Sequence, residues 1–247
     1  ADDAAVVTGT TTGAVTEGNV GDAAVTASGT LTISDVDGDD TPSFADVSST
    51  AGGNNYGTFV LTNGTWTYTL DQSAVQDLDA GDTVTDTITF TASDNTTQVA
   101  TVTITGTNNT PILSGDLSGT VLEGGAFVLT SSDLYFTDAD DAASEVTFTV
   151  SNLNNGTIEV NGSSALTFTG SQLSAGAVSF VHNDSDTTSA SFQVSVEDGD
   201  EDGSSPVAQT FNLSVTPVDD TPPVISSVVM SDSALTVGET STLTITF

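Results

Sequence analysis

The charge of this 247-residue chain is strongly negative, because it contains 34 Asp and Glu residues and no Lys or Arg. The acids are also clustered. The stretch Ser34–Asp40 holds four carboxylates in seven residues, and a partner run, Thr137–Asp141, lies about one domain length downstream. Their counter-charge must come from solution. A hard divalent cation such as Ca²⁺, which takes ~6–8 oxygen ligands, is the obvious candidate.

The composition predicts an all-β protein. Thr and Val favour strands, whereas Gly, Asp and Asn favour turns, and no long segment has apolar residues at helical spacing. The absence of cysteine excludes disulfides and any Cys-based zinc site or nucleophile. The length corresponds to about two domains. We expect tandem antiparallel β-sandwich domains in a linear array.

The net charge of −34 also excludes classes of partner. Nucleic acid and anionic membrane surfaces are bound through Lys and Arg, which this chain lacks. No apolar run approaches the ~18 residues of a membrane span, so we expect no membrane insertion. Adaptation to saline water is a simpler explanation of the charge, because salt screens self-repulsion. That explanation and specific Ca²⁺ sites are compatible, and the clustering of the acids favours adding the sites.

An internal repeat with a period just above 100 residues organises the chain. Each repeat begins with an acid or amide pair, continues to a single Glu in a Gly-containing turn, and in the first two repeats reaches an Asp-x-Asp run. The pairs are Asp2-Asp3, Asn108-Asn109 and Asp219-Asp220, the glutamates are Glu17, Glu123 and Glu239, and the runs are Asp35/Asp37 and Asp138/Asp140. This period suits tandem β-sandwiches better than a solenoid. The predicted domains are residues 1–110, 111–220 and the first strands of an incomplete third domain, 221–247.

Strands with alternating apolar and polar residues are prominent in residues 1–110. Thr65–Leu70 places Trp66, Tyr68 and Leu70 on one face, and Val84–Phe90 and Val99–Ile104 alternate in the same way. Asn63-Gly64 is a hairpin signal just before the first of these strands. One short helical turn is predicted over Ala74–Asp79.

In residues 111–220 we expect seven strands, a number typical of a sandwich. They are Phe127–Leu129, Val146–Val150, Thr157–Val160, Leu166–Phe168, Val178–Val181, Phe192–Val196 and Thr210–Val218.

Ordered motifs give the first domain a specific resemblance. The series Ala27–Asp37, Tyr56–Leu61, Asn63–Leu70, Ala80–Asp86 and Val102–Asn108 resembles the VCBS repeat of large bacterial RTX or biofilm-type surface adhesins. The family's usual Asn-Asp linker is replaced here by Asn108-Asn109, which reduces the charge of any linker site.

The remaining domains carry looser resemblances. Leu134–Asp141, Val178–Asp184, Phe192–Gly199 and Val215–Asp220 resemble cadherin-like repeats of the chondroitin-sulfate-proteoglycan type. Val228–Phe247 resembles the opening of a bacterial immunoglobulin-like domain. It supplies about two strands, so either the parent protein continues or another chain adds strands. We favour continuation.

The cadherin-like resemblance implies Ca²⁺ sites between neighbouring domains. In such rods a Glu near the start of a domain, an Asp-x-Asp further on and a linker Asp or Asn bind the ion. Carried over, the junction of the first two domains would use Asn108, Asn109, Glu123, Asp138 and Asp140. The N-terminal edge would use Asp2, Asp3, Glu17, Asp35 and Asp37, and the third junction would use Asp219, Asp220 and Glu239. The competing interpretation is that these are solvated turn residues.

A second acidic motif lies at Glu197–Gly203. Its residues Asp198, Asp200 and Asp202 match the first half of an EF-hand loop, but position twelve is Gln209 where that motif needs a bidentate Glu. The flanking segments read as strands. We therefore expect a hairpin tip, with Ca²⁺ or a bare acidic loop as the alternatives.

No catalytic constellation stands out. His182 is the one histidine, no Ser or Cys signature accompanies it, and we assign it to a strand edge. Acids this abundant make glycosidase-type carboxylate pairs meaningless from sequence. We predict that the chain is not an enzyme.

These features predict a calcium-stiffened extender of a large secreted bacterial adhesin, which holds a distal binding domain away from the cell surface in attachment or biofilm formation. Its partners would be neighbouring domains of the same long chain. Self-association as a subunit of a filament, sheath or surface layer is the first alternative. A carbohydrate-binding module is a lower one, because Trp66 and Tyr68 are expected in the core.

Overall fold

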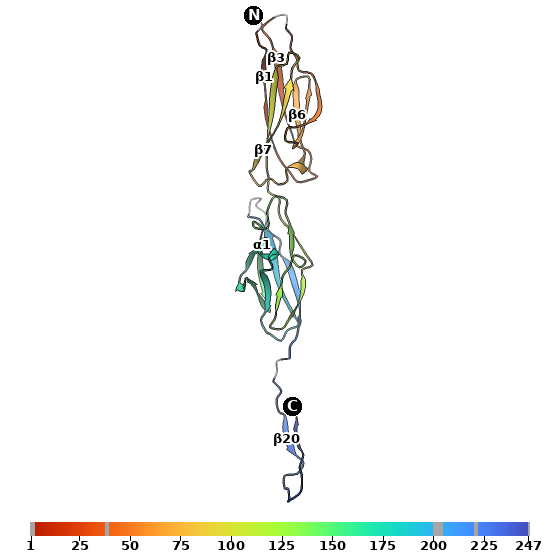
Figure 1. The fold of residues 1–247 in the computed structure, drawn as a ribbon, viewed down its shortest axis with the longest axis vertical. Coiled ribbons are helices and arrows are strands. Elements are labelled where there is room, and N and C mark those ends of the chain that lie inside the picture. Colours follow the sequence, from red (N-terminus) through yellow and green to blue (C-terminus); the bar gives the residue numbers. More distant parts are fainter. Residues whose placement is uncertain (1–2, 38–39, 200–204, 220–221, 247) are drawn as a thin grey trace.

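Two β-sandwiches lie end to end and are followed by a short hairpin (Figure 1). The computed structural model describes residues 3–37, 40–199, 205–219 and 222–246. Apart from the one-turn 3₁₀ helix η1 (Gln72–Ala74) and the short helix α1 (Gly170–Ser174), the regular elements of this part are strands, which confirms the all-β prediction. Among the described residues, no helix is long and apolar enough to cross a membrane.

The first sandwich, unit one, consists of two sheets. One has the order β1-β3-β6-β5-β4 and the other β2-β8-β7. The strands are β1 (Val6–Gly9), β2 (Thr12–Thr16), β3 (Thr26–Ser34), β4 (Val47–Ala51), β5 (Gly57–Thr62), β6 (Thr65–Leu70), β7 (Thr83–Thr91) and β8 (Thr97–Thr105).

The core of unit one is built on the alternation in β6. Trp66, Tyr68 and Leu70 are all buried, as the two-residue period predicts, because successive side chains of a strand point to opposite faces. The hairpin before β6 is also confirmed. Asn63 and Gly64 both have positive φ, 49° and 75°, which is the requirement of a type I′ turn.

The second sandwich, unit two, has the sheets β10-β19-β18-β13-β16 and β11-β17-β14-β15, with the additional pair β12-β9. The strands are β9 (Ile112–Ser114), β10 (Ser118–Leu122), β11 (Ala126–Val128), β12 (Tyr135–Thr137), β13 (Thr147–Asn154), β14 (Gly156–Val160), β15 (Ser163–Ser164), β16 (Thr167–Thr169), β17 (Val178–His182), β18 (Ser189–Glu197) and β19 (Gln209–Thr216). All seven predicted strands are present within a few residues of their expected bounds. The prediction missed β9, β10, β12 and β15.

Two details of the prediction need correction. The helical turn lies at Gln72–Ala74 and not at Ala74–Asp79, because the Asp71 side chain accepts the Ser73 N–H and starts it there. The sandwiches are also not purely antiparallel. In unit one β2 pairs in parallel with β8, and in unit two β10 pairs in parallel with β19.

The parallel pairs fix the two ends of each unit. We call the end where the chain enters a unit its leading end, and the end where the last strand leaves it the trailing end. Thr16 lies beside Thr105, and Leu122 lies beside Thr216. Residues that directly follow the first strand of the pair are therefore at the trailing end, next to the linker that leaves the unit.

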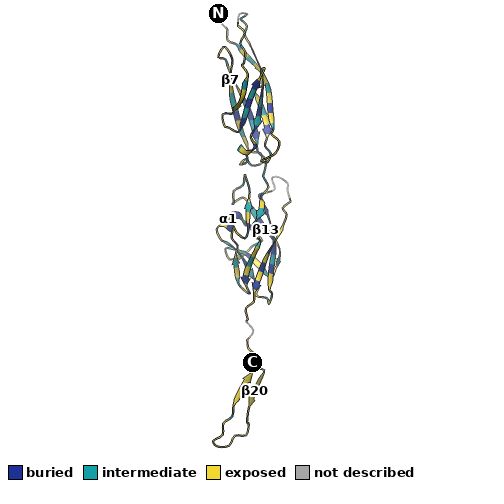
Figure 2. Cartoon of the chain, turned by 90° about the vertical axis from the view of Figure 1, so that its right-hand side faces the viewer, coloured by how far each residue is buried: buried dark blue, intermediate teal, exposed yellow. Residues whose placement is uncertain are grey.

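The hairpin of β20 (Ser227–Met230) and β21 (Leu243–Thr246) has no buried residue among those described, in contrast to the two sandwiches (Figure 2). Val228 faces Ile245 and Met230 faces Leu243 in register. Directly opposite residues share a face, so one face of the hairpin is apolar and exposed.

One carboxylate lies in the core of unit one. Asp86 on β7 is completely buried, on the same face as Phe90. Its carboxylate accepts the N–H groups of Asn54 and Thr87, both at 3.0 Å, and the hydroxyl of Tyr68 at 3.2 Å. Burial, and then the charge of Asp86, raise the pKa of Tyr68, so the phenol remains a donor.

Replacing Asp86 should therefore destabilise unit one. Asp86→Ala leaves three donors without their acceptor, of which the Tyr68 hydroxyl is buried. It should cost about 3 kcal/mol, whereas Tyr68→Phe, which removes one hydrogen bond, should cost about 1 kcal/mol. Urea unfolding followed by Trp66 fluorescence measures this, because Trp66 is the only tryptophan and lies in unit one. Asp186→Ala, at an exposed acid of unit two, is the control. Equal transitions for Asp86→Ala and the control would contradict the assignment.

Candidate metal centre

The trailing end of unit one places a buried carboxylate against the linker. Glu17 follows β2 and is 6% exposed. Its Oε1 accepts the N–H of Thr107 at 3.0 Å, which fastens the chain just beyond β8. Burial raises the pKa of Glu17, the Thr107 N–H opposes this, and the nearby Asp77 raises it further.

The leading end of unit two contributes a tight acidic loop after β12. Asp138 Oδ1 accepts the N–H groups of Asp140 and Asp141, at 3.2 and 3.0 Å. These bonds fold the loop so that the three side chains come together. Asp198, which follows β18 and is 7% exposed, lies beside them.

The linker bonds directly to this acidic loop. Asn109 donates its backbone N–H to Asp140 Oδ2 at 2.9 Å, and Asn108 donates its side-chain Nδ2 to Asp198 Oδ2 at 3.0 Å. Both linker amides therefore belong to the junction between the units, as the sequence predicted for these two residues.

The carboxylates at the junction form two overlapping groups. Oxygens of Asp138, Asp141 and Asp198 lie within 4.8 Å of one another, and so do those of Asp79, Asp140 and Asp141. Asp79 comes from unit one, and the others come from unit two. Ca²⁺–oxygen distances are about 2.3–2.6 Å, so oxygens on opposite sides of one ion are separated by about twice that distance. Both groups are small enough to surround a single cation.

Several buried oxygens at the junction have no hydrogen-bond donor in the described part of the chain. They are Glu17 Oε2, Asn108 Oδ1, Asp138 Oδ2, Asp140 Oδ1 and Asp198 Oδ1. A buried polar atom without a partner is costly. The donor set is all oxygen and comes from both units and the linker, which fits a hard cation such as Ca²⁺.

The pKa shifts agree with this geometry. Burial, and then the adjacent Asp138 carboxylate, raise the pKa of Asp140 to about 7, although the Asn109 N–H opposes the shift. The pKa of Asp79 is raised by burial first and then by the charges of Asp82, Glu145, Asp198 and Asp138. In both groups the charged form is disfavoured until a cation balances it.

Two glutamates lie at the opposite ends from those expected. Glu17 was grouped with the N-terminal edge, but it lies at the junction of units one and two. Glu123 was grouped with that junction, but it follows β10, is buried, and accepts the N–H of Val218 at 2.8 Å through Oε2. The parallel pairing of β2 with β8 and of β10 with β19 carries each glutamate to its own trailing end.

The two described members of the third predicted group, Asp219 and Glu239, lie in different segments. Glu239 lies in the turn of the β20–β21 hairpin, at the far tip of the structure (Figure 1), and its carboxylate accepts the N–H of Thr236 at 2.8 Å. Asp219 lies in the linker beyond Val218, on the side of Glu123. The predicted ligands Asp2, Asp200, Asp202 and Asp220 lie outside the described residues, and so does most of the expected hairpin tip.

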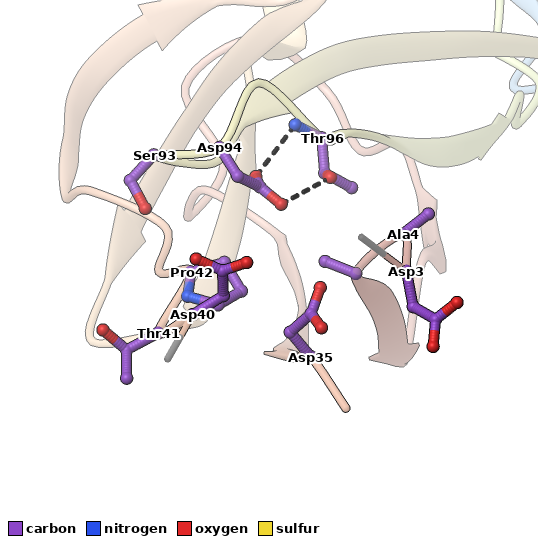
Figure 3. Close-up of a pocket in the computed structure, with 10 residues that line it drawn as sticks. Asp3, Ala4, Asp35, Asp40, Thr41, Pro42, Ser93, Asp94 and Thr96 are labelled. Atoms are coloured by element: carbon purple, nitrogen blue, oxygen red, sulfur yellow. Dashed lines mark hydrogen bonds between the residues drawn. The ribbon is translucent and has the colours of Figure 1, made fainter. Parts of the chain in front are cut away.

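The leading end of unit one repeats the acidic loop. Asp35 Oδ1 accepts the Asp37 N–H, and Asp37 Oδ2 accepts the Asp3 N–H, both at 2.8 Å. Oxygens of Asp35, Asp37 and Asp40 lie within 4.8 Å of one another. Figure 3 shows Asp35, Asp40 and Asp94 around a hollow of about 540 Å³.

The sequence prediction missed three members of these clusters, Asp40, Asp79 and Asp141, and also Asp94, which lines the hollow at the leading end of unit one. Asp40 and Asp141 adjoin the Asp-x-Asp runs, so the acidic stretches themselves were a usable signal. Asp79 and Asp94 lie in loops far from those runs along the chain, and no local pattern points to them. His182 is buried in β17, where Nδ1 accepts the Gly124 N–H at 3.3 Å and Nε2 contacts the Thr187 hydroxyl at 3.1 Å. These two bonds account for it as a structural residue.

Comparisons with known proteins agree on a cadherin-like character. Residues 2–107 match the family model of the bacterial cadherin-like domain, and residues 111–215 match the cadherin-like model. The human FRAS1-related extracellular matrix protein 1 is 31% identical over 127 residues, which are 51% of this chain and 6% of that protein. The chain therefore spans a small fraction of the length of this relative.

Solved cadherin structures are similar at low identity. Mouse cadherin-23 EC22-24 has a TM-score of 0.47 at 15% identity, covering 88% of this chain and 67% of that one. The protocadherin gammaB7 EC3-6 cis-dimer structure has a TM-score of 0.46 at 14% identity, covering 88% and 48%. Each unit thus matches a cadherin-like family model, and such domains suggest an extracellular role of the adhesion or extender type.

The raised pKa of Asp140 predicts how the metal-free protein responds to pH. Its pKa in the folded state, about 7, is above the ordinary value of 3.8, so the folded state binds the proton more tightly. The contribution of this protonated carboxyl to the free energy of unfolding is therefore fully present below about pH 4, and it is lost as the pH rises through about 7. Urea unfolding of metal-stripped protein should show this loss, and Asp140→Asn should reduce it. An identical pH profile for the variant would contradict the prediction.

Proposed function

We propose that this chain is an extender segment of a large secreted bacterial adhesin and that Ca²⁺ stiffens the junctions between its domains. The observation that carries the proposal is the set of five buried oxygens without donors, contributed by Glu17, Asn108, Asp138, Asp140 and Asp198. They come from unit one, the linker and unit two. A cation bound to them would tie the two units to each other.

Electrostatics support a cation as a requirement of the extended shape. Two carboxylates ~4 Å apart repel by about 4 kcal/mol at an effective dielectric of ~20. The chain has no Lys or Arg to offset this. Without metal, the carboxylates of Asp79 and of the Asp138–Asp141 loop would push the two units apart.

The comparisons support the same role. Cadherin-like domains are generally calcium-binding, and the match of unit one to a bacterial cadherin-like model agrees with a bacterial source. The name of the human relative includes the extracellular matrix, in agreement with a location outside the cell. The VCBS resemblance and the adhesin and biofilm context rest on the sequence motifs alone.

The same arrangement recurs at both outer ends. The leading end of unit one offers Asp35, Asp37 and Asp40. The trailing end of unit two offers Glu123, whose buried Oε1 also has no donor among the described residues. Each outer end has half of the elements found at the junction. We infer that the units are interchangeable segments of a longer metal-bridged rod.

Calorimetric titration of Ca²⁺ into metal-stripped protein at high NaCl tests the metal centre. We expect saturable binding that survives salt and is not matched by Mg²⁺, because Mg²⁺ demands a smaller, near-octahedral site. Asp138→Asn should weaken the affinity by about tenfold or more, which is about 1.4 kcal/mol. Asp186→Asn, at an exposed acid of the same unit, is the matched control. If no saturable heat is seen, the acids serve solubility and the proposal is wrong.

Small-angle scattering tests the stiffening itself. Chelation should change the maximum dimension and broaden the distance distribution, because the uncompensated carboxylates make the junction splay and flex. An unchanged maximum dimension on chelation would contradict stiffening of the junction by Ca²⁺.

A matched pair of variants separates the two junctions. Glu17 and Glu123 are both buried, and each accepts one linker N–H. Glu17→Gln should raise the Ca²⁺ concentration at which the NMR signal of the Asn109 amide shifts, and Glu123→Gln should leave it unchanged. The reverse result would restore the sequence-based grouping.

A further inference from the structure

A second feature of unit two lies apart from the metal centre. A groove of about 640 Å³ runs along β10, β19 and the start of β18. It shares no residue with the carboxylate groups at the junction. Its volume is within the ~300–1,000 Å³ of small-molecule sites.

The groove has an aromatic floor. Gly119 on β10 lacks a side chain where a Cβ would lie 2.7 Å from the ring of Phe127. The half-buried ring of Phe127 lines the groove at this point. Phe127 is the outermost of a row of rings, with Phe211 at 6.3 Å and Phe192 a further 4.8 Å away. The packed row holds the Phe127 ring in place.

The rim of the groove offers hydrogen-bonding atoms that the protein does not use. Asp116 accepts the Ser118 N–H through Oδ1, and Asp133 accepts the N–H and hydroxyl of Thr130 through Oδ2. Their other oxygens have no donor among the described residues, and the Asn212 side chain is exposed and also unbonded there. The rim thus presents two carboxylate oxygens and one amide, which together can accept from and donate to hydroxyls.

One residue of the rim, Leu117, has a strained backbone conformation. Leu117 has φ = +52°, whereas the other described residues with positive φ are Gly, Asn or Asp. Its N–H donates to the Asp133 carbonyl at 3.1 Å, and its own carbonyl accepts the Asn212 N–H at 3.0 Å. A left-handed Leu is unfavourable, and such strain is concentrated at functional sites. Here it ties Asp116, Asp133 and Asn212 into one fixed arrangement.

Unit one has a different ring at the related place. Gly13 on β2 also faces an aromatic ring, but that ring is Trp66, which is fully buried and donates Nε1–H to the Thr10 carbonyl at 2.7 Å. The larger indole fills the space beneath the strand. The two units therefore differ in the ring that packs beneath this glycine.

We propose that this groove binds one ring of a neutral sugar. The C–H face of a pyranose would lie on Phe127, and its hydroxyls would donate to Asp116 and Asp133 and accept from Asn212. An acidic sugar is excluded by the two rim carboxylates and the net charge of −34. This binding activity goes beyond the extender role and does not depend on Ca²⁺ at the junction.

NMR titration of the Ca²⁺-saturated full chain tests the proposal. The probes are the methyl glycosides of glucose, galactose, mannose and N-acetylglucosamine, with methyl glucuronide as the charged counterpart of the glucoside. We expect saturable shifts of the Gly119 and Leu213 amides with at least one neutral glycoside and none with the glucuronide. No saturable shift at these amides with any neutral glycoside overturns the proposal.

Variants assign the binding to the groove. Asn212→Ala removes an exposed, unbonded side chain and should lower the affinity roughly three- to tenfold, the value of one hydrogen bond. Phe127→Leu keeps the floor apolar but removes the ring and should also weaken binding. Tyr135→Ala, at an exposed aromatic outside the groove, should bind as the unmodified chain does. Binding that Asn212→Ala and Phe127→Leu leave unchanged, or binding of a lysine-rich peptide at the same amides in preference to every glycoside, refutes the sugar site.

Discussion

The structure depends on a charge that the chain cannot neutralise itself. With 34 acids and no Lys or Arg, every carboxylate must face solvent, accept hydrogen bonds or meet a cation. Asp86 shows the second solution, because two backbone N–H groups and the Tyr68 hydroxyl satisfy it inside the core. The junction of the two units does not reach that solution. There, buried oxygens of Asp138, Asp140 and Asp198 have no donor in the described protein, and this is the basis of the proposed cation site.

Strand order explains how one motif serves two neighbours. Because the first strand of each parallel pair runs beside the last strand of its unit, the glutamate that follows it reaches the trailing end. The Asp-x-Asp loop stays at the leading end, beside Asp198 in unit two. The junction of the two units therefore brings the trailing end of unit one, with Glu17, to the leading end of unit two, with the Asp-x-Asp loop. The linker residues Asn108 and Asn109 bond to the leading end of unit two through Asp198 and Asp140. They directly follow Thr107, which bonds to Glu17 at the trailing end of unit one.

Local patterns predicted the strands and the turns well, because a two-residue alternation of apolar and polar side chains can be recognised in consecutive residues. Trp66, Tyr68 and Leu70 are the clearest case. The strand β10 was missed because Gly119 interrupts its apolar face, and its pairing with β19 spans almost 100 residues. The glutamates were placed at the wrong ends for the same reason, since their positions depend on which distant strand the first strand pairs with. The Asp-x-Asp runs were found because they are local, whereas Asp79 was not, because it reaches the junction only after the linker brings the units together.

The two units also differ in the aromatic ring that packs beneath the first strand of the parallel pair. The first strand of each parallel pair, β2 in unit one and β10 in unit two, has a glycine where an aromatic ring approaches the backbone. In unit one the ring is an indole that closes the core and bonds to the Thr10 carbonyl. In unit two the ring is the phenyl of Phe127, which has no polar atom to anchor it and leaves room beside Gly119. A spacer gains nothing from a strained Leu117 and an incompletely covered ring. Their persistence in one unit alone is better explained by a surface that contacts something outside the chain, and stiff junctions would hold such a surface in a fixed direction.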